Sequence, residues 1–240
     1  MKIKLNKRLK NPIIIGGFPG IGLIGTISTE FLVKHLDAKP IGYIWSDKLM
    51  PMAAVHESKI LQPLEMFHDS KHNILILHAL SDIRGLEWQL GDALLELSKA
   101  VKAKEFICLE GVLSKTETSN MYYLTTSKAS EKSFNRVKDK VSIGPLKEGI
   151  IMGVTAALLL RTINTPMSGI FVETHSKLPD SKAAAKIIEV LDSYLGLKVD
   201  YKPLIKAAEV FESQIKDLLA NAKATTEHKK EKTEHMNYMG

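Results

Sequence analysis

Three glycines in the first part of the chain have the spacing of a dinucleotide-binding turn. Gly20, Gly22 and Gly25 follow a β-branched run at residues 13–15, where that motif turns a strand into a helix. Backbone N–H groups and the helix amino terminus would then face a pyrophosphate. Asp47, which follows the second predicted strand, is the candidate for binding the ribose. On spacing alone, these residues predict a nucleotide-binding enzyme.

A second interpretation gives the same glycines a structural role. Phe18 and Pro19 stiffen the turn in a way that the dinucleotide fingerprint does not require. Glycine also lets a helix pack closely on a neighbouring strand. We favour this packing interpretation, expect no cofactor, and keep nucleotide binding as the alternative.

Acidic and imidazole side chains follow two later predicted strands. Glu110 comes after the strand that contains Cys108, and Glu173 and His175 lie at the end of another strand. Open α/β sheets place ligand sites at the carboxyl ends of their strands. These three residues therefore form a candidate pocket, and in the enzyme alternative the chemistry would occur near Glu173.

Other catalytic and metal signatures are missing. The sequence has no Gly-x-Ser-x-Gly elbow, no His-Glu-x-x-His motif and no paired cysteines. Cys108 lies in an apolar strand, where a thiol is usually an inert small hydrophobe. His68 and His72 have a helical spacing, but Pro63 and Asn73 argue against a helix there. We predict no catalytic residue and no metal site.

The elements that would position these residues alternate between strands and helices, which favours parallel strands joined by crossover helices. Small strands and turns at a sheet edge are expected over residues 53–67, and the polar segment 114–139 is expected to contain one strand. The expected strands cover residues 13–15, 40–45, 73–79, 106–109, 121–125 and 169–174, and the expected helices cover 22–36, 86–101, 148–161, 181–195 and a last helix from about 203.

The domain organisation follows from a change of composition near residue 220. Residues 1–220 read as a single α/β domain, and residues 221–240 as a flexible polar tail with an apolar tip. The last helix has apolar residues with coiled-coil spacing, an arrangement that also suits a helix packed on its own domain. The candidate partner contacts in this part of the chain are Phe211, Ile215 and Leu218 on the helix, and Tyr238 and Met239 at the tip.

Composition limits the class of protein. The chain has 240 residues, of which 45% are hydrophobic and 25% charged, and it has one cysteine. The amino terminus resembles no secretory signal, and the apolar run at residues 150–160 is too short to cross a bilayer. We expect a cytoplasmic protein that does not bind membranes.

The net charge of +6 raises the question of nucleic acid. Basic residues gather at the amino terminus and over residues 128–140, where Glu131 and Asp139 interrupt them. Neither group contains the interleaved aromatic residues that stack on bases. A solvated basic surface is therefore favoured over a nucleic-acid site.

The segment at residues 17–25 (GFPGIGLIG), which includes Gly17, Pro19 and the three glycines above, resembles the opening motif of the proteasome assembly chaperone 2 family. Further segments of the family follow in the expected order, over about residues 12 to 219. They are Pro51 with Val55-His56, GPLKEG at 144–149, VETH at 172–175, PDSKAA at 179–184 and LKVDYKPL at 197–204.

This resemblance implies a phosphorylase/hydrolase-like, three-layer α/β fold, with a mainly parallel sheet and helices on both faces. It also implies homo-oligomers and a non-enzymatic, chaperone-like role in binding proteasome α subunits. Some of these chaperones dock a carboxyl-terminal hydrophobic–Tyr–any tripeptide between α subunits. Here Tyr238 is third from the end, so the register differs by one residue, or roughly 3.5 Å of extended chain.

Overall fold

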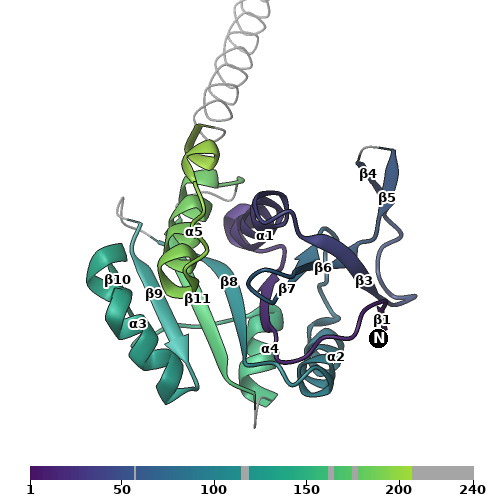
Figure 1. Ribbon diagram of the computed structural model, residues 1–240, viewed down its shortest axis with the longest axis horizontal. Coiled ribbons are helices and arrows are strands. Elements are labelled where there is room, and N and C mark those ends of the chain that lie inside the picture. The colour runs from purple at the N-terminus through teal and green to yellow at the C-terminus, as the bar shows by residue number, and fades with distance from the viewer. Residues whose placement is uncertain (57, 115–118, 162–164, 175–177, 207–240) are drawn as a thin grey trace, which may run out of the picture.

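The computed structural model describes residues 1–56, 58–114, 119–161, 165–174 and 178–206. A nine-stranded sheet lies between two layers of helices (Figure 1). Its strands are β1 (Lys2–Leu5), β2 (Ile13–Gly17), β3 (Lys39–Trp45), β6 (Leu64–Asp69), β7 (Ile74–Ala79), β8 (Glu105–Leu113), β9 (Met121–Thr125), β10 (Ile143–Pro145) and β11 (Met167–Thr174).

The helices connect these strands across both faces of the sheet. They are a 3-10 turn η1 (Ile21–Leu23) and the helices α1 (Ile24–His35), α2 (Glu87–Ala100), α3 (Lys128–Val141), α4 (Gly153–Arg161) and α5 (Ser181–Leu195). Among the described helices, none is long and apolar enough to cross a bilayer.

The strand order is β1-β3-β6-β7-β2-β8-β11-β9-β10. Its centre is parallel, because β2 pairs with β7 and β8, and β8 pairs with β11, all in the same direction. β1, β3 and β6 are antiparallel on one side, and β9 runs antiparallel to β11 on the other. The predicted α/β fold is confirmed, with parallel pairing at the centre of the sheet.

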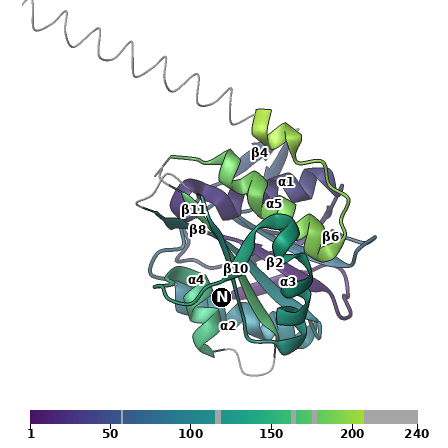
Figure 2. The same ribbon diagram turned by 90° about the vertical axis from the view of Figure 1, so that its left-hand side faces the viewer.

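Each face of the sheet has its own hydrophobic core. One core packs α1, α3 and α5 against the sheet, and the other packs α2 and α4 against the opposite face (Figures 1 and 2). The central strands are buried on both faces; in β7, for example, every residue is buried. This explains why their sequences read as continuous apolar runs.

The structure adds elements that the sequence pattern did not predict. Helix α3 occupies much of the polar segment 114–139, and its buried residues are Ser130, Phe134 and Val141. Strands β4 (Ala54–His56) and β5 (Lys59–Leu61) form a separate hairpin that projects from the body (Figure 1). The small strands expected over residues 53–67 are present, but their expected position at a sheet edge is wrong: β4 and β5 form a sheet of their own, and β6 lies between β3 and β7 in the main sheet.

The predicted last helix is described only at its start, where residues 202–206 are helical. The boundary near residue 220 and the tail lie outside the described residues. The same holds for the candidate partner contacts Phe211, Ile215, Leu218, Tyr238 and Met239.

The β2–α1 turn lies in very close contact with β8. A Cβ atom on Gly17 would lie 2.1 Å from the carbonyl oxygen of Gly25, and one on Gly25 would lie 2.6 Å from that of Leu109. A Cβ on Gly111 would lie 2.3 Å from the carbonyl oxygen of Ile21. These glycines are required because backbone occupies the space that a side chain would need.

We predict that G17A and G25A each lower the free energy of unfolding by about 2–4 kcal/mol, because the added methyl group forces the backbones apart. The matched control is G144A in β10, where a Cβ would meet nothing within 4 Å. The control should stay within about 0.5 kcal/mol of the wild type in chemical denaturation. Equal stability of G25A and G144A would contradict the packing account.

Candidate functional site

The glycine-rich turn is poorly suited to a pyrophosphate. The Oε2 atom of Glu110 lies 3.4 Å from the position of a Cβ on Gly20. The N–H of Leu23 is used within the turn and donates to the Gly20 carbonyl at 3.1 Å. When it is ionised, the Glu110 carboxylate would repel an anion at this point. The geometry favours the packing interpretation for Gly25, and Gly22 has a φ of +66° that favours glycine, whereas a Cβ on Gly20 would make only ordinary contacts.

Asp47 cannot act as the ribose ligand of such a turn. In a dinucleotide-binding unit the second strand lies beside the first. Here Asp47 follows β3, and β6 and β7 separate β3 from β2. The prediction that Asp47 binds a ribose is therefore wrong, because the strand that comes second along the chain does not lie beside the strand before the glycine-rich turn.

Glu110 was expected to follow its strand, but it lies inside β8, three residues before the end at Leu113, and it contacts α4. The hydroxyl of Thr155 donates to its Oε1 at 2.5 Å. Burial raises the pKa of the Glu110 carboxyl to about 7, although the Thr155 hydrogen bond acts in the opposite direction. Cys108 lies two residues earlier and is fully buried, and burial raises the pKa of its thiol. Such a thiol is not an activated nucleophile.

Glu173 belongs to a different cluster. It accepts hydrogen bonds from the backbone N–H of Asn120 at 3.1 Å, from the Asn120 side chain at 2.9 Å and from the Tyr122 hydroxyl at 3.0 Å. Glu110 stands opposite Phe171 in the β8–β11 register, so Glu173 lies two residues further along the neighbouring strand.

The candidate pocket is thus divided between two separate sets of contacts. Glu110 bonds to α4, and Glu173 bonds to β9 and the residue before it. Among the described residues, no hydrogen bond joins the two carboxylates. His175, the third predicted member, lies outside the described residues.

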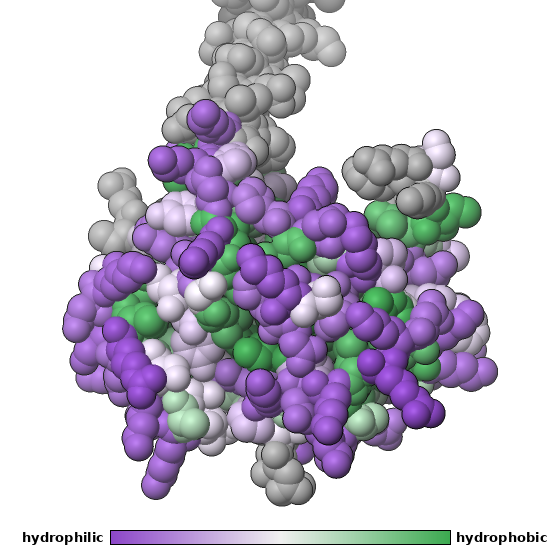
Figure 3. Space-filling view, viewed as in Figure 1, coloured by the Kyte–Doolittle hydropathy of each residue, from purple (hydrophilic) through white to green (hydrophobic). Residues whose placement is uncertain are grey.

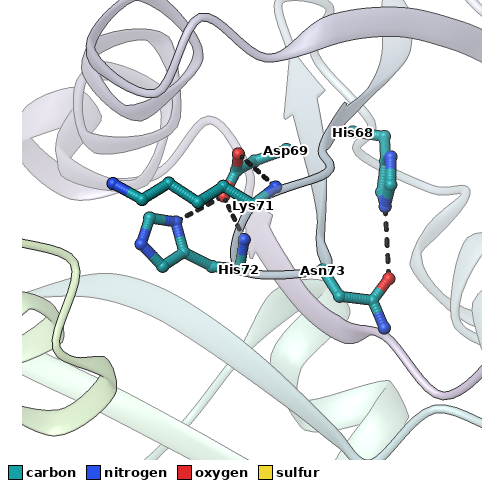
Figure 4. A network of polar contacts seen from close by, with 5 residues as sticks. All are labelled: His68, Asp69, Lys71, His72 and Asn73. Carbon is teal, nitrogen blue, oxygen red and sulfur yellow. Dashed lines mark hydrogen bonds and ion pairs between the residues drawn. The ribbon is translucent and has the colours of Figure 1, made fainter.

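The two histidines with helical spacing lie at the turn between β6 and β7 (Figure 4). Asp69 accepts from the backbone N–H groups of Lys71 and His72 and lies 2.6 Å from Nδ1 of His72. The His68 ring bonds instead to Asn73, with Nε2 3.2 Å from Oδ1. The two rings therefore stabilise a turn and do not converge on a common point.

The described part of the chain offers these groups no cluster of metal ligands and shows only a small void nearby. No group of three or more His, Cys, Asp or Glu side chains there could hold a metal ion. A void of about 10 Å³ lies between Phe18, His78 and Leu90. This volume is close to the limit for a single water molecule.

The sequence pattern points to the two carboxylates but not to the residues that donate hydrogen bonds to them. Thr155 was a readable signal, since it is a polar residue in the apolar run at 150–160 and is fully buried. Asn120 and Tyr122 gave no such signal, because they lie in a segment rich in polar residues.

We predict a pH-dependent stability from Glu110. Folding favours the protonated carboxyl, so its cost to stability is absent below about pH 4.5 and grows as the pH rises toward 7. E110Q removes this cost while it keeps an acceptor for Thr155. Relative to the wild type, its free energy of unfolding should therefore rise by up to about 3 kcal/mol between pH 4.5 and pH 8. A pH-independent difference in chemical denaturation would contradict this.

Comparison with known proteins places this structure in a family. The profile of the PAC2 family matches residues 14–219. The crystal structure of Pyrococcus furiosus PbaA, an archaeal homolog of proteasome-assembly chaperone, is 30% identical with a TM-score of 0.80, and 98% of each chain is covered. PbaB of the same organism, an archaeal proteasome activator, is 20% identical with a TM-score of 0.75, over 90% of this chain and 98% of that one.

An uncharacterized protein of Methanocaldococcus jannaschii is 26% identical over 220 residues, which are 90% of this chain and 88% of that protein. The family profile and the likeness to PbaA both extend over most of the chain. The resemblance predicted from the sequence motifs is confirmed: this chain belongs to the PAC2 family.

Proposed function

We propose that this chain is a non-enzymatic, chaperone-like protein that binds proteasome α subunits during proteasome assembly. The observation that carries the proposal is the likeness to PbaA, at 30% identity over 98% of both chains. The relation to PbaB adds the fold of an archaeal proteasome activator. Two neighbours with proteasome-related functions therefore share the architecture of this chain.

The state of the polar groups supports binding over catalysis. Glu110 and Glu173 accept hydrogen bonds from their own chain, and the glycine-rich turn is packed against β8. Internal hydrogen bonds of this kind are expected of carboxylates that connect elements of a fold.

We also propose that the chain forms a homo-oligomer through α4 and the segment before it. Ile150, Met152 and Leu160 are 86%, 71% and 74% exposed. Ile150 and Met152 lie just before α4, and Ala156 and Leu160 are four residues apart on one side of the helix. Exposed apolar residues grouped in this way are typical of protein–protein contacts.

The carboxyl-terminal segment is a second proposed contact. The predicted last helix has coiled-coil spacing at Phe211, Ile215 and Leu218. The apolar groups at the tip of the tail are Tyr238 and Met239. Because Tyr238 is one residue out of the docking register, we expect the domain to provide most of the affinity for α subunits. The tail would then add to a complex that forms without it.

Native mass spectrometry with cognate α subunits tests the proposed function. We expect a complex at micromolar concentration with the full chain and with a chain ending at residue 220. Y238A separates a contribution of the tail from that of the domain. Absence of a complex with both the full and the shortened chain would overturn the proposal. If the complex is lost only with the shortened chain and with Y238A, the main contact with α subunits lies in the tail.

Light scattering after gel filtration tests the oligomer. The wild type should have a multiple of the 26.7 kDa chain mass, and M152D/L160D should reduce it, because aspartates in an apolar interface lack partners. The control is V55D/I60D on the β4–β5 hairpin, whose side chains are 71% and 68% exposed. A wild type at 26.7 kDa would exclude the oligomer, and dissociation only in the control would place the interface at the hairpin.

A further inference from the structure

Helix α3 presents a row of basic side chains on its outer surface. Lys128, Lys132, Arg136 and Lys140 are four residues apart, and all four are exposed. We call these four residues the α3 basic row. Successive members lie one above the other on a helix, so the row extends along the full length of α3. Figure 3 shows a hydrophilic surface at the left, where Figure 1 places α3.

The α3 basic row has no acidic partner in the described part of the chain. The ion pairs there include Lys34 with Glu30 at 2.8 Å and Lys39 with Asp37 at 2.5 Å, but they include no residue of α3. Two basic residues at the amino terminus do have partners, which are aromatic rings. Lys2 lies 5.7 Å from the ring centroid of Trp45, and Lys4 lies 5.6 Å from that of Tyr43.

The row opposes the stability of the helix that carries it. Like charges four residues apart repel each other, and the row contains three such spacings. With respect to the helix dipole, Lys128 in the first turn is unfavourable and Lys140 in the last turn is favourable, so the repulsion within the row is the effect that remains. Glu131 and Asp139 lie three residues from Lys128 and Arg136, but neither forms an ion pair with them in the structure.

The fold is held by the opposite side of α3. Phe134 is fully buried and stacks between Tyr123 and Tyr194, with ring centroids at 4.4 and 4.3 Å. The side chain of Ser127 caps the helix by accepting from the N–H of Ser130 at 3.4 Å. These contacts position α3 without any help from the basic row, so the fold does not explain the row.

We infer that the α3 basic row is a docking surface for an acidic surface of the protein that this chain binds. The inference rests on the proposed function, which makes that protein a proteasome α subunit. Charge complementarity is the argument, because an acidic partner would relieve the repulsion within the row and speed the encounter. The row would therefore act mainly on the association rate and make binding sensitive to salt.

A protein partner fits this surface better than a nucleic acid does. Glu131 and Asp139 lie among the basic residues of α3, where they would repel phosphates. The aromatic residue of the helix, Phe134, is fully buried and cannot stack on a base. The row offers charge without a stacking surface.

The test uses the full chain with K128E/R136E, which makes all three spacings in the row opposite in charge. The thermal midpoint should stay within about 3 °C of the wild type. The variant removes the repulsion within the row, and this gain offsets the new repulsion between the introduced glutamates and Glu131 and Asp139. The Kd for cognate α subunits, measured by calorimetry, should rise at least about 10-fold at 50 mM salt. The difference from the wild type should shrink at 300 mM salt.

The control is K48E/K104E, which changes the net charge equally at two exposed lysines outside α3. It should bind within about 2-fold of the wild type. An equal loss of affinity in both variants would mean that only the net charge matters, and it would overturn the inference of a docking surface. Wild-type affinity in K128E/R136E would overturn it while the proposed function stands. Binding of the wild type to duplex DNA or RNA but not to α subunits would overturn both.

Discussion

The contact between the β2–α1 turn and β8 is made by backbone against backbone, and it fixes where the first helix can lie. The turn can approach β8 only because Gly25 and Gly111 have no side chains, and α1 can approach the end of β2 only because Gly17 has none. Asp180, at the start of α5, donates its N–H to the carbonyl of Gly22 at 2.9 Å. The same turn therefore positions α1, α5 and the end of β8. A nucleotide-like glycine spacing is here a requirement of packing.

The parts of the fold with strong hydrophobic periodicity could be predicted from the sequence. β2, β7 and α2 were predicted within one or two residues, because their buried faces leave a clear pattern. Helix α3 was missed because Ser130 occupies one of its few buried positions and charges cover its outer surface. The order of strands in the sheet could not be predicted from the sequence pattern, and the wrong prediction for Asp47 followed from this.

The candidate site could be predicted only in part, for a related reason. Position at a strand end marks Glu110 and Glu173, but hydrogen-bond partners decide what a carboxylate does. Thr155 comes from a helix 45 residues away along the chain, and Tyr122 from a strand 51 residues away. These partners turn two candidate catalytic groups into connections between a helix or strand and the sheet. The exposed surfaces include an apolar one at α4 and a basic one at α3.

The central claim is that this chain works through its surfaces and not through a strand-end pocket. Hydrogen exchange of the full chain, with cognate α subunits and separately with ATP, tests it most directly. We expect slower exchange over residues 128–141 in the presence of α subunits, and no change with ATP at residues 17–25 or 108–113. Protection of the glycine-rich turn and of the segment around Glu110 by ATP, with no protection by α subunits, would contradict it.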